Sequence, residues 1–158
     1  MFNRILTTIC LLLIFTATKA QDTVDAYVEK EFVIIKSAPK YEDALQTAKL
    51  AATKLQLKLD LRELKKNTAT GLTWSKQTCE DEWGEFPCYV ARGRYDDGNY
   101  VSIEYSNAYT GFREGYYIVI VAGGERGSKE VKSALTNAKK IYKDAYSKRT
   151  KVYVGCMH

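Results

Sequence analysis

The 158-residue chain carries 24 basic and 19 acidic side chains, a formal net charge of +5, and 46% of its residues are hydrophobic. This basic excess is too small to indicate a nucleic-acid partner, since nucleic-acid-binding proteins normally show a clustered surplus of Lys and Arg. The length fits one domain that buries about two-thirds of the surface exposed by its unfolded chain.

Residues 1–20 predict a signal peptide. Arg4 gives a positive start, Ile5–Phe15 is an apolar run too short to span a bilayer, and Thr18-Lys19-Ala20 offers the small residues that signal peptidase reads. An N-terminal membrane anchor is the alternative. The mature chain, residues 21–158, would carry a charge of about +3, because two of the 24 basic residues leave and all 19 acids stay. We expect a periplasmic or extracellular protein with no membrane span after cleavage.

The first part of the mature chain predicts a strand, a helix and a second strand. Glu31–Ser37 is rich in β-branched residues and ends before Pro39, which predicts a strand. Tyr41–Leu57 carries alanine and leucine at three- and four-residue steps, which predicts a helix that packs closely on a sheet. Lys58–Leu64 alternates apolar and polar residues, which predicts the next strand.

The last part predicts the same order of elements. Tyr116–Ala122 is a continuous apolar run, typical of a strand covered on both faces, and Gly123–Gly127 is interpreted as a flexible turn. Ser128–Tyr146 has helical periodicity and Lys151–Gly155 predicts a short strand. Both helices contain the pattern A-L-x-x-A-K, at residues 44–49 and 134–139, which indicates an internal repeat. We therefore predict an α+β fold: a ferredoxin-like pair of β-α-β units with both helices on one face of a mainly antiparallel sheet.

Residues of about 65–115 form an insertion between these two units, and its cysteines indicate a disulfide. Cys79 and Cys88 bracket an acidic, aromatic loop, and export favours a bridge between them. Cys156 is then unpaired, and three pairings are formally possible. A zinc site built from these cysteines and His158 is the alternative, but no CxxC spacing supports it. We expect no metal and no cofactor.

A β-hairpin is predicted inside the insertion, with an exposed tyrosine-rich face. Tyr89–Tyr95 and Tyr100–Ser106 flank Asp96-Asp97-Gly98-Asn99, a strong hairpin signal. Arg92 and Arg94 would lie on the core face and reach outward. Aromatic rings with polar neighbours suit sugars and also protein partners, although tyrosine also simply fills strands well. The predicted ligand-binding residues on the other face are Tyr89, Tyr95, Tyr100, Ser102 and Glu104.

Catalytic constellations are not evident in the sequence. The only histidine is the last residue, which argues against Ser/His or Cys/His chemistry. Asp96 and Asp97 are interpreted as turn residues, and the acids around Trp83 as a solvated loop, rather than as paired glycosidase carboxylates. We expect a protein that is not an enzyme.

The predicted export and the two β-α-β units resemble the SPOR (sporulation-related repeat) domain over residues 31–64 and 116–155. Val33–Ala38 leads to Ala44 at the spacing of that family's first repeat, with Ser37 matching and Lys36 and Ala38 replacing its glycine and phenylalanine. The resemblance implies a ferredoxin-like fold that binds peptidoglycan glycan strands in the bacterial envelope. The insertion lies outside it, and it assigns no glycan contact to individual residues here.

These observations predict an exported, non-enzymatic envelope protein that binds peptidoglycan or another glycan through its tyrosine-rich face. The alternative is a secreted protein–protein interaction module or inhibitor that uses the Cys79–Cys88 loop, because a pre-ordered loop loses less entropy on binding.

Overall fold

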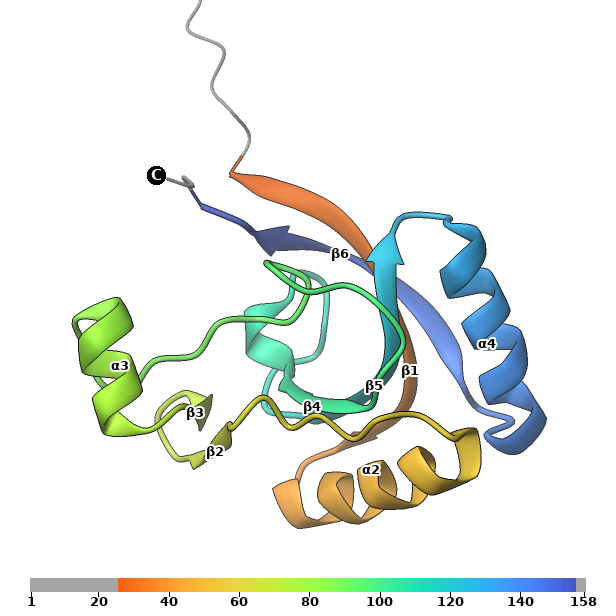
Figure 1. Ribbon diagram of the computed structural model, residues 1–158, viewed down its shortest axis with the longest axis horizontal. Helices are drawn as coiled ribbons and strands as arrows, with labels where there is room; N and C mark the ends of the chain where they lie inside the picture. Colours follow the sequence, from red (N-terminus) through yellow and green to blue (C-terminus); the bar gives the residue numbers. More distant parts are fainter. Residues whose placement is uncertain (1–25, 156–158) are drawn as a thin grey trace, which may run out of the picture.

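The computed structural model describes residues 26–155, which fold around a four-stranded antiparallel sheet (Figure 1). The expected signal peptide, Cys156 and His158 lie outside the described residues. The sheet order is β4-β5-β1-β6, and every neighbouring pair is antiparallel. The strands are β1 (Tyr27–Ala38), β4 (Ser102–Tyr105), β5 (Tyr117–Glu125) and β6 (Tyr146–Tyr153).

Two helices complete the repeated units and confirm the α+β, ferredoxin-like class. The helix α2 (Tyr41–Leu55) connects β1 to the insertion, and α4 (Lys129–Ile141) connects β5 to β6. The sheet order brings β1 between β5 and β6, so each β-α-β unit is split by a strand of the other. Ser128 caps α4 by accepting a hydrogen bond from the Val131 N–H, and the helix ends at Ile141, five residues earlier than predicted.

The second strand of the first unit was wrongly predicted at Lys58–Leu64. That segment is an extended connection whose backbone pairs with Val101 alone, where the Val101 N–H donates to the Lys58 carbonyl at 2.8 Å and the Asp60 N–H donates to the Val101 carbonyl at 2.9 Å. Arg62 and Glu63 then take positive φ angles of 56°, a backbone conformation that ends any strand. β4 occupies this place in the sheet instead, so the insertion runs from residue 56 to residue 101.

The insertion contains a hairpin and a helix, but not where they were expected. The hairpin pairs β2 (Lys65–Asn67) with β3 (Gly71–Thr73), whereas residues 89–95 form no strand. The acidic segment predicted as a loop is the helix α3 (Lys76–Trp83), which Ser75 caps. The predicted hairpin of residues 89–106 is therefore wrong, because its second half pairs with β5.

Gly123 and Gly124 belong to β5 and not to a turn, contrary to the prediction. A Cβ atom at Gly123 would lie 2.6 Å from the Phe32 ring, so the ring fills the space that the glycine leaves. The strand prediction itself is confirmed, since Tyr117–Gly124 is buried throughout.

Side chains pack on both faces of the sheet. Val33, Val119 and the small side chains of α2 form the core on the helix face, where Ala44, Ala48 and Ala51 are all 0% exposed. The other face carries Phe32, Ile34, Ile118, Ile120 and Val152, and Ala91 together with Ala108, Tyr109 and Phe112 packs against it. The helix-free face of the sheet is therefore not an open surface.

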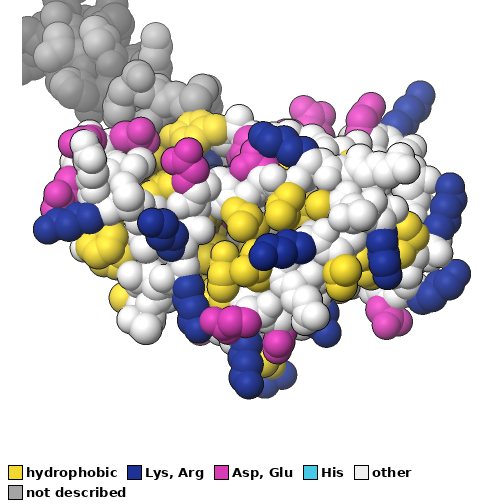
Figure 2. All heavy atoms as spheres, turned by 60° about the horizontal axis from the view of Figure 1, so that its bottom comes forward, with side chains coloured by type: hydrophobic (Ala, Val, Ile, Leu, Met, Phe, Trp, Pro, Cys, Tyr) yellow, Lys and Arg dark blue, Asp and Glu magenta, His cyan; other side chains and the backbone are white. Residues whose placement is uncertain are grey.

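The outer surface carries both signs of charge. Figure 2 brings the α2 side of the molecule forward and shows basic and acidic side chains scattered around exposed apolar groups, with no continuous patch of one sign. Among residues 26–155, no helix combines the length and apolar character that a membrane crossing requires.

Candidate functional site

The structure does not place the five predicted ligand-binding residues on one exposed face. Ser102 and Glu104 are 0% exposed, Tyr89 and Tyr100 are half-buried, and only Tyr95, at 61%, is well exposed. The expectation of an exposed face is therefore corrected: Ser102 and Glu104 lie on the helix-free face of the sheet, beneath the insertion.

Glu104 is the centre of a buried polar network. Its carboxylate accepts two hydrogen bonds from Arg62, at 3.1 and 2.9 Å, and one from the Tyr89 hydroxyl at 2.6 Å. The Arg92 backbone N–H adds a fourth, at 3.3 Å. Burial lowers the pKa of Arg62, but the carboxylates of Glu104 and Asp96 outweigh it and hold that pKa above its ordinary value.

Arg92 joins the insertion to the sheet. Its guanidinium donates to the Tyr100 and Gly98 carbonyls at 3.0 and 2.8 Å and to the Ser102 hydroxyl at 3.0 Å. It lies 3.5 Å from the centre of the Tyr100 ring, whose hydroxyl donates to Asp96. Arg92 is 0% exposed, so the expectation that its side chain reaches outward is wrong.

Burial raises the pKa of Tyr89 well above its ordinary value, so its hydroxyl stays protonated and donates to Glu104. The Glu104 and Arg62 side chains are 0% and 12% exposed and bind one another, so the charged pair at the centre of this network is closed to a substrate. The network therefore anchors the insertion on the sheet, a structural role.

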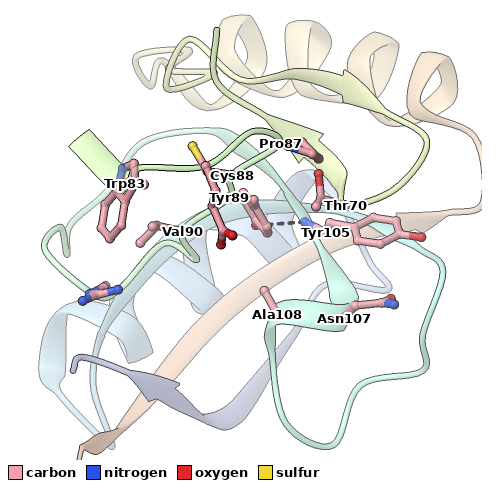
Figure 3. Close-up of a pocket in the computed structure, with 11 residues that line it drawn as sticks. Thr70, Trp83, Pro87, Cys88, Tyr89, Val90, Tyr105, Asn107 and Ala108 are labelled. Atoms are coloured by element: carbon pink, nitrogen blue, oxygen red, sulfur yellow. Dashed lines mark hydrogen bonds between the residues drawn. The ribbon is translucent and has the colours of Figure 1, made fainter. Parts of the chain in front are cut away.

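A cavity of about 440 Å³ lies beside this network, at the surface of the insertion. Figure 3 shows Trp83 at one end and Tyr105 with Asn107 at the other, with Tyr89 and Val90 between them. The cavity is lined by Thr70, Trp83, Glu85, Pro87, Cys88, Tyr89, Val90, Arg94, Tyr105, Asn107 and Ala108. Aromatic, apolar and polar groups therefore share one concave surface.

The disulfide and α3 position one wall of this cavity. The predicted Cys79–Cys88 bridge is present and ties α3 to the segment that carries Tyr89. Trp83, the last residue of α3, stacks on Trp74 with ring centres 6.3 Å apart and planes 5° from parallel. The Trp74 indole N–H donates to the Arg62 carbonyl at 2.7 Å, so this wall is connected to the buried network.

Arg94 lies at the Trp83 end of the cavity, among three aromatic rings. Its guanidinium carbon is 5.2 Å from the Trp83 ring centre, 5.0 Å from that of Tyr95 and 5.4 Å from that of Tyr153. The Trp83 Nε1 and Arg94 Nε atoms are buried, and neither has a hydrogen-bond acceptor among residues 26–155. Such donors favour a ligand that supplies oxygen acceptors, because a buried unpaired N–H is unfavourable by about 1–3 kcal/mol.

Of the five predicted ligand-binding residues, only Tyr89 lines this cavity, while the Cys79–Cys88 loop, predicted as an alternative contact element, contributes Trp83, Glu85 and Pro87. Sequence reasoning missed Arg94, Tyr105 and Asn107, which come together only because β4 pairs with β5 and carries the following turn of chain across the insertion. A tryptophan between two cysteines was the one signal that pointed to Trp83.

Within residues 26–155, no group of three or more His, Cys, Asp or Glu side chains is arranged to hold a metal ion. Comparison of the chain with protein-family models, with curated proteins and with solved structures finds no match. The resemblance to the SPOR domain therefore stays a prediction.

Proposed function

We propose that this protein is an exported, non-enzymatic glycan-binding protein of the cell envelope, with peptidoglycan or a related polysaccharide as its ligand. The insertion cavity, rather than the sheet, is the binding site in this proposal. The observation that carries it is the combination of Trp83, Tyr89 and Tyr105 with polar groups in one cavity of about 440 Å³.

Sugars match this surface chemically. The C–H faces of a pyranose ring pack on aromatic rings, while its hydroxyl and acetamido oxygens accept hydrogen bonds. Trp83 and Arg94 both line the cavity, and their Nε1–H and Nε–H groups are donors without an acceptor among residues 26–155, of the kind that pairs with such oxygens. An N-acetylated glycan offers both kinds of group.

Two measurements test this proposal. The mature protein is incubated with purified peptidoglycan sacculi and sedimented, and its affinity for soluble oligomers of β-1,4-linked N-acetylglucosamine is measured by calorimetry. We expect retention on sacculi and saturable binding. Absence of both, with a genuine SPOR domain retained in parallel, would contradict the proposal.

Matched aromatic variants locate the site. Trp83→Ala should weaken binding at least about tenfold, equal to about 1.4 kcal/mol. Phe86→Ala is the control, since Phe86 lies in the same disulfide loop, is 45% exposed and does not line the cavity. Because Trp83→Ala also removes the stack on Trp74, Glu85→Trp provides a second variant that fills the cavity rim without removing an aromatic contact. If Trp83→Ala, Glu85→Trp and Phe86→Ala all bind the glycan with the wild-type affinity, the ligand binds elsewhere.

A protein partner is the second candidate, and the outer surface of α3 favours it. Glu80, Asp81 and Glu82 are exposed there, close in sequence to the exposed Phe86. Reduction of the disulfide does not separate the two candidates, because Cys88 itself lines the cavity. Glu82→Lys combined with Phe86→Ala does: it should abolish capture of a protein partner and leave sugar binding intact.

A further inference from the structure

We propose that the glycan occupies two adjoining cavities, so that the protein binds the interior of a linear chain rather than a single sugar. This inference rests on the proposed function. The second cavity, of about 410 Å³, is lined by Tyr27 from β1, Tyr153 from β6, and residues 107–112 between β4 and β5. We call the cavity that contains Trp83 the first cavity.

The two cavities share a wall. Asn107 and Ala108, in the short 3-10 helix η1 (Ser106–Ala108), line both of them. Figure 3 shows both side chains at the border of the first cavity. A second contact joins them, since Arg94 lines the first cavity and its guanidinium lies 5.4 Å from the ring centre of Tyr153 in the second. The two cavities therefore lie side by side, with Asn107 and Ala108 between them.

The second cavity repeats the chemistry of the first. The rings of Tyr27 and Tyr153 meet edge to face with centres 5.2 Å apart, and they are 44% and 49% exposed. The two residues are paired in the sheet, so their backbones are held side by side and their rings are in contact before any ligand arrives. Thr110, Glu114 and Lys151 supply polar groups around them. Aromatic and polar groups at both cavities suit successive sugar units of one polymer.

Chain length is the variable that tests this inference. Calorimetry compares chitobiose with chitohexaose, the two- and six-unit oligomers of β-1,4-linked N-acetylglucosamine, against the mature wild-type protein and Tyr153→Ala. A longer chain also offers more overlapping binding registers, which raises its apparent affinity without a second subsite. In Tyr153→Ala, the ratio of the chitohexaose affinity to the chitobiose affinity measures this effect of overlapping registers alone.

We expect the wild-type ratio to exceed the Tyr153→Ala ratio by about tenfold. Tyr153→Phe should keep the wild-type ratio, because it retains the ring. Tyr146→Ala is the matched control: Tyr146 is also on β6, is 40% exposed, and lines neither of the two cavities.

The outcomes separate the two proposals. Equal ratios in wild type and Tyr153→Ala, with binding of both oligomers retained, would overturn the second subsite and leave the proposed function in place. An equal loss for both oligomers would also overturn it, since Tyr153 would then act only through Arg94 on the first cavity. No binding of either oligomer, together with no retention on sacculi, would overturn both proposals.

Discussion

Replacing Glu104 by alanine should destabilise this protein more than any comparable change on its surface. The carboxylate is 0% exposed and accepts two hydrogen bonds from Arg62 and one from Tyr89. Its removal leaves the Arg62 guanidinium, whose side chain is 12% exposed, without its nearest negative charge. Removing one partner of such a buried pair destabilises proteins by about 3–5 kcal/mol. The free energy of unfolding of a domain of this size is about 5–15 kcal/mol, so the variant would retain only a small part of its stability.

Urea denaturation followed by tryptophan fluorescence measures this change. With a slope of about 2 kcal/mol per molar urea, the midpoint should fall by about 2 M at unchanged slope. Trp74 reports the site directly, since its indole N–H donates to the Arg62 carbonyl. Tyr89→Phe is the milder control. It removes the hydroxyl that donates to Glu104 and accepts from the Tyr105 backbone N–H, but it leaves the Arg62–Glu104 pair intact, so the free energy of unfolding should fall by about 1.5–3 kcal/mol.

A double-mutant cycle isolates the pair. Arg62→Met alone leaves the buried carboxylate unpaired, whereas Arg62→Met together with Glu104→Ala leaves neither charge buried. The double variant should therefore be more stable than the sum of the single changes by about 1–3 kcal/mol. Additive single changes, or a loss below about 1 kcal/mol in Glu104→Ala, would show that the pair does not anchor the insertion.

Three further changes test other parts of the fold. Gly123→Ala should lower the free energy of unfolding by about 1–3 kcal/mol, because the new Cβ would lie 2.6 Å from the Phe32 ring. Gly124→Ala is the control, since its Cβ would lie 3.4 Å from the nearest atom, a methyl carbon of Val131. Equal urea midpoints for the two variants would contradict this prediction. The hydrogen bond from the Ser147 hydroxyl is the main reason that the pKa of Glu31 is lowered in the folded protein. The ionised carboxylate therefore stabilises the fold at pH values above the pKa that it has in the unfolded chain. This stabilisation is lost as the pH falls through the lower pKa of the folded state. The difference in unfolding free energy between wild type and Glu31→Gln should thus shrink between pH 5 and pH 3, and a constant difference would contradict the assignment. Replacing both Cys79 and Cys88 by serine should lower the free energy of unfolding by about 2.5–3 kcal/mol. Thiol titration of the unfolded wild-type protein checks that the bridge is present. An unchanged thermal midpoint in the double variant would contradict the prediction.

Local sequence patterns were sufficient for the elements with strong periodicity. The apolar run ending at Ala122 predicted a strand buried on both faces, and the alanines of α2 predicted a helix packed closely on the sheet. Both predictions depend only on side-chain spacing, which the sequence states directly. Cysteine spacing likewise predicted the Cys79–Cys88 bridge, since a short loop keeps the two thiols close.

Strand partners could not be predicted in the same way. Residues 100–105 have the alternation of a strand, and the sequence offered residues 89–95 as a nearby partner across a good turn. The structure pairs β4 with β5 instead, since that pairing completes the sheet over a buried apolar strand. Arg92 then lies inside the protein, bound to backbone carbonyls, where a strand pairing would have turned it outward.

The sequence by itself determined the class of this protein: two β-α-β units around an antiparallel sheet, and an insertion with a disulfide. It also supplied the residue types of the candidate site, tyrosine, tryptophan and arginine. Only the tertiary structure decided which of them line a cavity. Ser102 and Glu104 became core, while Trp83 and Arg94 became the wall of a cavity. Burial depends on which distant segments cover a residue, and that is a property of the assembled sheet and insertion rather than of any local pattern.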